Sequence, residues 1–434
     1  MLIKRNKKMN FRKTFTYLTL ATAVLLAGAF TASAADNTPN GKKITFTTKS
    51  KEAKDNVAEI VRSIESFKFG NEWLPLAQKA VEADPEFAFA HYLVATATPP
   101  PNAKPHADKA VELSKKASEA ERRYIEAVFL TRAQKHDEAI AIFTDLARQY
   151  PEERMVQMML GQVSMAKGNL DQARTHFEQA RKLDGSTPRV YAFLGNIHLI
   201  KGDYGKAREY FKTSLNKKAP GTAPGGPAYG LAFSHLYEGD LATALKTLEA
   251  YQVDYANTAG ARDFPPVFVW NSIGRLLLEN GRAADSIKAY ESGYATVSGS
   301  NLPEQEKKVW LGRLHHGKGR ALAKMGKHEE AWKEAELIKK MIDEGGEQGQ
   351  QFMPAYHYIA GYLKLERGDY AKAVEHLKQS DLTDPFHKLL LARAYEKAGD
   401  EANAQKLYKE IVTFPFNSME RALAYPEAKK KVKS

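Results

Sequence analysis

The fold is decided by the stretch MVQMMLGQVSMAKGNLDQARTHFEQARKLDG (residues 155–185), which is followed by RVYAFLGNIHLIKGDYGKAREYFKTSLNKKA (residues 189–219). The two stretches align without a gap at a separation of 34 residues. A fixed period of this length indicates a solenoid, in which one repeat cannot bury its own apolar face and needs neighbours. The repeat therefore favours one elongated array, although 434 residues alone would permit two or three globular domains.

Each copy contains two amphipathic segments of about a dozen residues, with apolar residues at helical spacing. Gly168 lies between the two segments of the first copy, where one helix must end and the chain must turn back. The small residues Gly161 and Ala173 allow two helix backbones to approach closely, and the ring of Phe177 fills the space beside them. All four residues have counterparts 34 positions later, so the pattern predicts helical hairpins.

This pattern resembles the tetratricopeptide repeat, which has a small residue at position 8, Gly near 15, Ala at 20, an aromatic residue at 24 and often Pro at 32. The resemblance implies an all-α fold, a right-handed superhelical α-solenoid of helix–turn–helix repeats. Eight repeats are expected, with their position-20 residues at Ala139, Ala173, Ala207, Ala244, Ser286, Ala331, Ala373 and Ala404. The unequal steps between them reflect either loops that tolerate extra length at low cost or a specialised central binding region.

We expect five segments along the chain. They are a signal peptide (1–34), a flexible lead-in (35–50), degenerate N-terminal repeats (51–119), the eight-repeat solenoid (120–412), and a C-terminal capping helix with a basic tail (413–434).

The first 34 residues have the three parts of a secretory signal peptide. Six basic residues precede a mostly apolar run at 17–30, and Ala32-Ser33-Ala34 provides small residues for cleavage. The apolar run is short for a transmembrane span, although an uncleaved anchor is the alternative. With no cysteine in the chain, neither a disulfide nor a lipid-attachment site is available. We therefore predict an extracytoplasmic protein, most simply in a bacterial periplasm, with no membrane span after cleavage.

The charge of the chain argues against nucleic acid as a partner. The net charge is +12, and the six basic residues of the leader account for half of it. The remainder is mildly basic and lacks the concentrated patch that nucleic-acid binding requires. The lysine-rich tail (429–433) is interpreted as a solvated end.

The residues provide little sign of catalysis. No HExxH, CxxC or GxSxG motif is present, so the usual zinc and nucleophile spacings are missing. His315 and His316 could ligate a metal together with His357, because neighbouring repeats stack. We nevertheless predict a non-enzymatic protein with no cofactor and no metal. A hydrolase built on the solenoid around His316 and His357 is the least favoured alternative.

The resemblance also implies where a partner binds, because the first helix of each repeat lines the concave groove in this family. The groove so predicted is rich in Tyr, Arg and Met, types that suit protein interfaces. The alternative is that several of these side chains only pack between adjacent first helices. The predicted groove residues are Tyr124, Arg132, Met158, Asn196, Tyr229, Phe233, Asn271, Arg275, His316, Arg320, Tyr358 and Tyr362.

We therefore predict an exported scaffold or adaptor that binds a protein or an extended peptide in its concave groove, within an envelope assembly. The alternative function is recognition of an envelope polysaccharide, or of its export machinery, by the aromatic and arginine side chains. Sugar stacking would depend on the tyrosines, so loss of binding on Tyr→Ala but not on Arg→Ala substitutions would favour the glycan.

Overall fold

The computed structural model is built from α-helices, and the part of the chain that it describes contains no strand. The prediction of an all-α array of helical hairpins is confirmed. The structure describes residues 42–68, 70–99, 102–258, 260–414 and 417–432. The predicted signal peptide (1–34) lies outside them.

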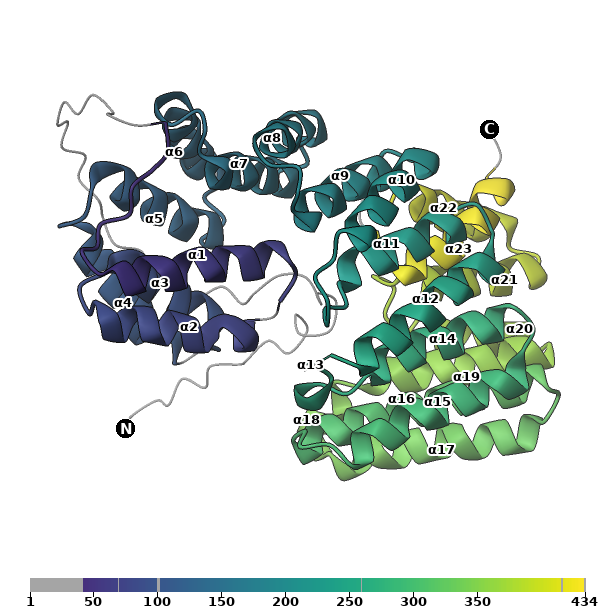
Figure 1. The fold of residues 1–434 in the computed structure, drawn as a ribbon. Coiled ribbons are helices and arrows are strands. Elements are labelled where there is room, and N and C mark those ends of the chain that lie inside the picture. The colour runs from purple at the N-terminus through teal and green to yellow at the C-terminus, as the bar shows by residue number, and fades with distance from the viewer. Residues whose placement is uncertain (1–41, 69, 100–101, 259, 415–416, 433–434) are drawn as a thin grey trace, which may run out of the picture. The chain divides into compact units, whose positions relative to one another are not determined.

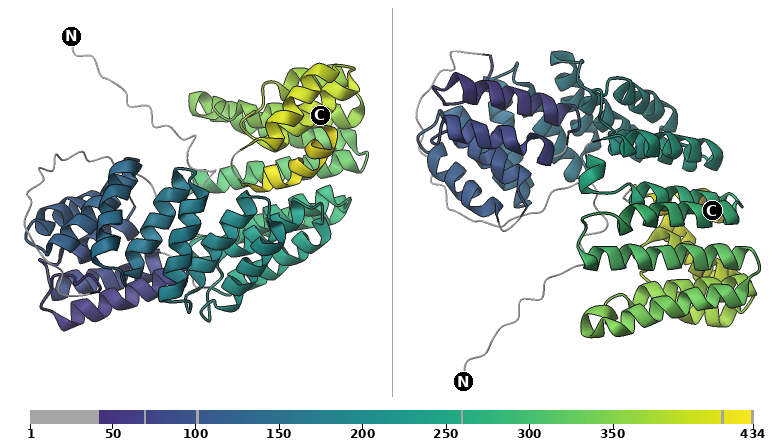
Figure 2. Two further views of the ribbon diagram at one scale, coloured as in Figure 1. Left: turned by 90° about the horizontal axis from the view of Figure 1, so that it is seen from above. Right: turned by 60° about the horizontal axis from the view of Figure 1, so that its bottom comes forward.

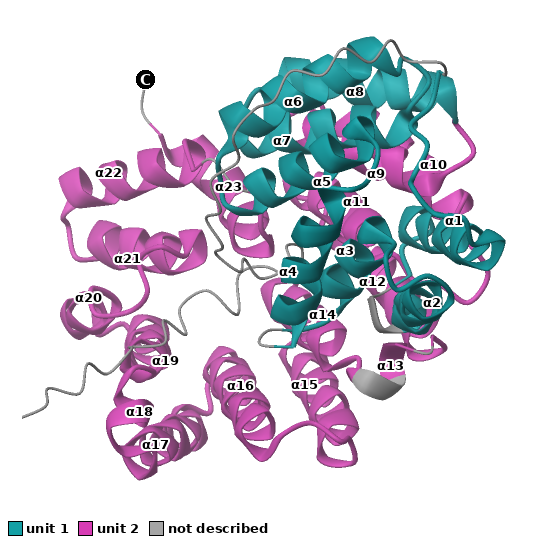
Figure 3. Cartoon of the chain, turned by 90° about the vertical axis from the view of Figure 1, so that its left-hand side faces the viewer, with its two compact units in different colours: residues 1–184 teal, residues 185–434 magenta. Residues whose placement is uncertain are grey.

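The chain forms two compact units, residues 1–184 and 185–434 (Figure 3). The boundary falls inside the predicted array, between the two repeats that match each other best. The described helices of unit 1 are α1 (Lys51–Glu65), α2 (Gly70–Ala83), α3 (Ala88–Ala97), α4 (Ala103–Ser114), α5 (Glu119–Arg132), α6 (His136–Gln149), α7 (Arg154–Ala166) and α8 (Leu170–Leu183).

Unit 2 contains the longer helices and the short extra ones. Its described helices are α9 (Pro188–Ile200), α10 (Tyr204–Asn216), α11 (Gly225–Leu236), α12 (Leu241–Ala256), α13 (Gly260–Asp263), α14 (Val267–Glu279), α15 (Ala283–Ser298), α16 (Glu304–Lys324), α17 (His328–Glu344), α18 (Gly346–Gln350), α19 (Met353–Arg367), α20 (Tyr370–Leu377), α21 (Pro385–Lys397), α22 (Glu401–Val412) and α23 (Met419–Lys431).

Consecutive helices pair as antiparallel hairpins, and each hairpin packs on the next within its unit (Figures 1 and 2). In unit 1 the pairs are α1/α2, α3/α4, α5/α6 and α7/α8. In unit 2 they are α9/α10, α11/α12, α14/α15, α16/α17, α19/α20 and α21/α22. We call the surface formed by the first members of these pairs the first-helix surface of each unit. No helix in the described residues is long and apolar enough to cross a membrane.

The two helices of a hairpin pack closely where a glycine of the first helix meets an aromatic ring of the second. A Cβ atom added to Gly161 would lie 2.5 Å from Cε1 of Phe177, a ring that is fully buried. The equivalent atom on Gly195 would lie 2.8 Å from Cδ1 of Phe211 in the next repeat. Position 8 is therefore small because the aromatic ring of the second helix occupies the place of its side chain.

The turn between the two helices of a repeat is set by a glycine and the residue after it. Gly202 adopts φ +78°, a left-handed conformation that residues with a Cβ rarely take. Asp203 follows and caps α10, since its carboxylate accepts a hydrogen bond from the backbone N–H of Lys206. The same Gly-Asp arrangement precedes α12 and α22.

Candidate functional site

In unit 1 the first-helix surface holds a segment of the chain's own N-terminal region. Residues 44–48 are neither helix nor strand, yet their backbone is hydrogen-bonded to distant carboxylates. The N–H of Ile44 donates to Oε2 of Glu153 at 3.2 Å, and the N–H of Thr47 donates to Oε2 of Glu121 at 2.5 Å. The described part of the lead-in, which was expected to be flexible, thus has defined contacts with the starts of α5 and α7. These contacts could not be predicted from the sequence, because the donors are backbone N–H groups.

An aromatic contact anchors the same segment. The ring of Phe46 stacks on Phe89 of α3 with ring centroids 4.0 Å apart. It also meets Tyr124 of α5 edge-on at 6.1 Å. Tyr124, a predicted groove residue, is buried beneath this contact and against Phe143. The first-helix surface of unit 1 is therefore covered here by part of the chain itself.

The two carboxylates that hold the segment are themselves buried. Burial raises the pKa of both Glu121 and Glu153, and the backbone N–H groups that they bind partly oppose the rise. Oε1 of Glu121 accepts from the N–H of Phe89, and Oε1 of Glu153 accepts from that of Met155. A desolvated carboxylate of this kind is suited to binding backbone N–H groups of an extended peptide.

In unit 2 the corresponding occupant is the last helix. Helix α23 contacts α11, α21 and α22. Its Met419 and Ala422 belong to the same apolar core as Leu236 and Tyr237 at the end of α11, almost two hundred residues earlier in the chain. On another side, Ala424 and Ala428 join the core that includes Phe386 of α21. The helix expected to cap the last repeat therefore also reaches repeats near the middle of the chain.

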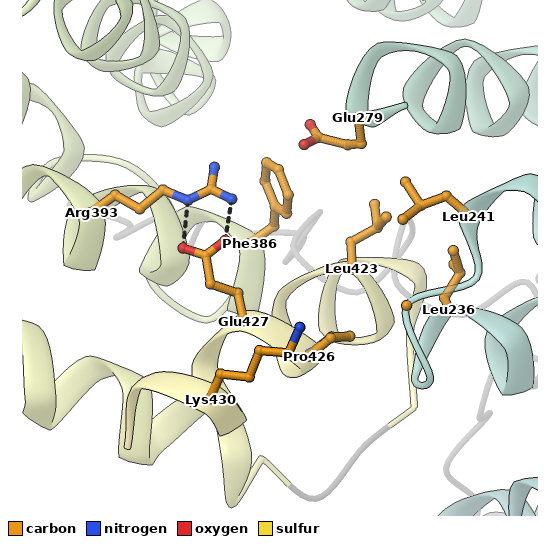
Figure 4. Close-up of a pocket in the computed structure, with 10 residues that line it drawn as sticks. Leu236, Leu241, Glu279, Phe386, Arg393, Leu423, Pro426, Glu427 and Lys430 are labelled. Carbon is orange, nitrogen blue, oxygen red and sulfur yellow. Dashed lines mark hydrogen bonds and ion pairs between the residues drawn. The ribbon is translucent and has the colours of Figure 1, made fainter. Parts of the chain in front are cut away.

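Two ion pairs fix α23 against first helices. Nη1 of Arg275, in α14, donates to Oε1 of Glu420 at 2.8 Å. Arg393, in α21, makes two bonds to the carboxylate of Glu427, at 2.9 and 2.5 Å, which Figure 4 shows as a fork. The two glutamates are seven residues apart, so they lie on one face of the helix. Paired, directional bonds of this kind are the stronger class of charged hydrogen bond.

A cluster of arginine, histidine and tyrosine lies beside the Arg275–Glu420 pair. Arg320 is buried and donates to the hydroxyls of Tyr290 and Tyr358, at 2.9 and 3.2 Å. The ring of His316 lies 4.4 Å from that of Tyr358, which lies 3.8 Å from that of His387. Burial lowers the pKa of His316 well below its usual value. The cluster thus keeps its histidine neutral beside fixed arginine charges.

The charges around Arg275 act on one another. Burial raises the pKa of Asp384 to about 7, and the Glu420 carboxylate adds to the rise. Burial and Arg275 together lower the pKa of His387 to about 3. The charges of Glu420 and Arg275 also act on Arg313, whose side chain is exposed. Glu420 is therefore the carboxylate through which α23 meets this cationic region.

A cavity of about 370 Å³ remains beside α23. It lies between α23, α21, the end of α14 and the turn from α11 to α12 (Figure 4). Glu279 faces it with one carboxylate oxygen that has no hydrogen-bond partner in the described part of the chain. The lining residues are Leu236, Gly239, Leu241, Glu279, Phe386, Arg393, Leu423, Pro426, Glu427 and Lys430.

The structure brings together some of the predicted groove residues. Arg275, His316, Arg320 and Tyr358 form the cluster just described, and Tyr362 is buried one turn beyond Tyr358. Because Tyr358, Tyr362 and Arg320 are buried, their side chains fill the interior of the repeats in this arrangement. Their role in binding a partner remains a prediction.

The other predicted groove residues lie apart from this cluster. Tyr229 and Phe233 contact each other, and the Tyr229 hydroxyl lies 3.0 Å from Oγ of Ser272. Asn271 donates to the carbonyl of Val267 in its own helix. Arg132 donates to Thr96, Met158 is buried, and Asn196 is half-buried in α9.

Several residues at this site were not predicted. Glu420 and Glu427 lie in α23, after the last repeat, whereas Arg313 and Phe386 lie on the first helices α16 and α21 but were not among the predicted groove residues. The spacing of the two acids, seven residues apart in one helix, is a signal that could have identified the two glutamates.

The histidines considered as an alternative metal site each have another partner. His315 contacts Glu334 at 2.5 Å, and His357 contacts His376 at 3.0 Å. Within the described residues, no group of three or more His, Cys, Asp or Glu side chains is arranged to hold a metal ion.

Comparisons with known proteins identify the repeat. Family models described as "Tetratricopeptide repeat" match residues 130–173, 158–224 and 388–413. A tetratricopeptide repeat protein from Parabacteroides merdae ATCC 43184 is similar in structure, with 13% identity and a TM-score of 0.45, over 63% of this chain and 98% of that one.

Two further solved structures are similar at the same level. PilW, described as a widely conserved type IV pilus biogenesis factor, has 14% identity and a TM-score of 0.39 over 54% of this chain and 98% of its own. YrrB, described as a TPR protein with an unusual peptide-binding site, has 18% identity and a TM-score of 0.34 over 46% and 91%. What those proteins bind does not transfer at these values. The matched segments, in agreement with the paired helices, identify this chain as a protein that contains tetratricopeptide repeats.

Proposed function

We propose that this protein is an exported, non-enzymatic scaffold that binds segments of other proteins on its first-helix surfaces. One observation supports the proposal above the rest: both units already hold a polypeptide segment on that surface. In unit 1 the segment is extended and centred on Phe46, and in unit 2 it is the helix α23. Surfaces that accommodate a segment of the chain itself have the chemistry to accommodate a partner's.

The physical basis of binding would be preorganisation. The anchoring groups, such as Glu121 in unit 1 and Arg275 in unit 2, are on helices that are packed into the repeats. A rigid receptor loses little conformational entropy when it binds, so more of the contact energy appears as affinity. The contacts in both units combine aromatic rings with charged hydrogen bonds, the combination typical of strong interface positions.

Export is part of the same proposal and rests on the leader. The basic start, the apolar run and Ala32-Ser33-Ala34 support cleavage after residue 34. The partner would then be a protein of an extracytoplasmic compartment, within an envelope assembly.

The proposal is tested by photocrosslinking from one position on a first helix and one position on a second helix. A photoreactive phenylalanine analogue replaces exposed Arg313 on the first helix α16, or exposed Lys333 on the second helix α17 as the matched control. We expect one protein from envelope extracts to crosslink from position 313 and not from 333. Equal crosslinking from both positions, or none from 313, would reject the first-helix surface of unit 2 as the binding site. Retention of a polysaccharide in place of a protein would favour the glycan function.

A further inference from the structure

We propose that α23 occupies the place of a partner helix in unit 2, and that the partner is an amphipathic helix with two carboxylates seven residues apart that displaces α23. The inference rests on the proposed function and names the class of segment that this surface takes. We call the surface that receives α23, formed by Tyr237, Arg275, Phe386 and Arg393, the α23 seat.

Charge complementarity defines the partner. Arg275 and Arg393 of the seat each bind one carboxylate of α23, and both glutamates lie on one face of that helix. The Arg275 side chain is only 14% exposed, so removing its counter-charge leaves a poorly hydrated cation. A replacement helix must therefore bring acidic side chains at the spacing of Glu420 and Glu427.

The apolar fit of α23 to the seat is loose. Of its four buried apolar residues, three are alanines, Ala422, Ala424 and Ala428. Alanine buries little area, so these contacts stabilise the docked helix weakly. The cavity of about 370 Å³ beside Leu423 and Pro426 is further space that α23 does not fill. A partner with larger apolar side chains at these positions gains contacts that α23 lacks.

The polar fit is also incomplete. Nε and Nη2 of Arg275, Nε of Arg421, Nδ2 of Asn417 and Oε1 of Glu279 are buried atoms with no hydrogen-bond partner in the described residues. Folded proteins leave few such groups, because each one costs its lost hydration. Several such groups around one helix indicate that a different segment could form hydrogen bonds with them that α23 does not form.

The backbone of α23 has a related defect. Pro426 lies inside the helix, where it has no N–H to donate to the carbonyl four residues earlier. A partner helix without proline at this position would complete its own hydrogen-bond ladder and would pay no such penalty when it docks.

The test uses the full chain and a synthetic helix added in trans. The probe is a fluorescent peptide of residues 417–432 that carries Pro426→Leu, and the control peptide carries Glu420→Gln and Glu427→Gln in addition. The receptors are the wild-type chain and a chain with Glu420→Gln and Glu427→Gln in its own α23. A third chain with Glu329→Gln and Glu336→Gln, two exposed acids seven residues apart on α17, has the same change of charge away from the seat.

We expect the probe to bind the Glu420→Gln/Glu427→Gln chain at least about tenfold more tightly than wild type, since its own helix competes less, and the control chain to behave as wild type. The control peptide should bind at least about tenfold more weakly than the probe. Circular dichroism and the melting temperature check that each chain is folded. Equal affinities for the wild-type and Gln chains, equal affinities of the two peptides, or no binding to either chain would overturn the inference.

Hydrogen exchange supplies a second readout. Excess probe added to wild type should speed amide exchange in residues 419–431 while α21 stays protected. Binding without faster exchange there would mean that the peptide binds elsewhere, and would also overturn the inference. A partner that crosslinks from position 313 while the peptide tests fail would leave the proposed function standing. Failure of the crosslinking alone would reject capture of an envelope protein at the first-helix surface of unit 2, and the peptide result would still decide whether a helix displaces α23.

Discussion

At the scale of single residues, the repeat depends on a glycine that leaves room for a ring. Gly161→Ala would place a Cβ atom 2.5 Å from the buried ring of Phe177, so we expect a loss of about 1–3 kcal/mol in the free energy of unfolding. The control is Gly205→Ala in α10, where a Cβ meets nothing within 4 Å and should cause no loss. Urea denaturation followed by circular dichroism measures both. Equal losses for the two variants would contradict this account of position 8.

Asp384 and His387, at the start of α21, should change the free energy of unfolding in opposite directions as pH changes. The pKa of His387 is lowered to about 3, so its contribution to stability is present above its ordinary pKa of 6.5 and is lost as pH falls. The pKa of Asp384 is raised from 3.8 to about 7, so its contribution falls as pH rises through that window. Both shifts are caused mainly by burial.

Two variants separate these effects. We compare the free energy of unfolding near pH 7.5 with that near pH 5. His387→Gln should lose less stability than wild type on acidification, because it removes a group that resists protonation. Asp384→Asn should lose more, because it removes a group whose protonation favours the folded state. Changes of the same sign in both variants would show that these side chains do not control the pH response.

At the scale of elements, the ring of Phe46 should be the main anchor of the extended segment of unit 1 (residues 44–48). Phe46→Ala removes the stack on Phe89, and burial of a large part of a phenylalanine contributes roughly 1–3 kcal/mol. We expect trypsin to cleave after Lys42, Lys43 or Lys49 markedly faster in this variant. The matched control is Thr45→Ala, because the Thr45 side chain is exposed and its backbone carbonyl still accepts from Ser118. Unchanged cleavage in Phe46→Ala would mean that the backbone bonds to Glu121 and Glu153 suffice.

At the scale of the whole molecule, export predicts a shortened chain. The mature protein should begin at Ala35, as read by N-terminal sequencing of protein from an extracytoplasmic fraction. Ala34→Phe should block processing, since the cleavage site requires small residues. A protein that keeps Met1 in the wild type would remove the export part of the proposed function and leave the peptide-binding part untouched.

The helical hairpins could be predicted from the sequence because their determinants are local and repeated. The Gly161–Phe177 pair recurs 34 residues later as Gly195–Phe211, and the turn at Gly202-Asp203 needs only two adjacent residues. Such signals are visible in one chain without any knowledge of its neighbours. The register also located Arg275, His316, Arg320 and Tyr358, which the fold gathers into one cluster.

The occupants of the two first-helix surfaces were decided only by tertiary structure. Tyr237 bonds to Asn417, 180 residues later, and Ile44 bonds to Glu153, 109 residues later. No period links such pairs, and several of the bonds use backbone groups that every residue type possesses. The sequence by itself therefore determined the repeats and the register of their first helices. Which segment lies on each surface depended on burial and charge pairing between distant parts of the folded chain.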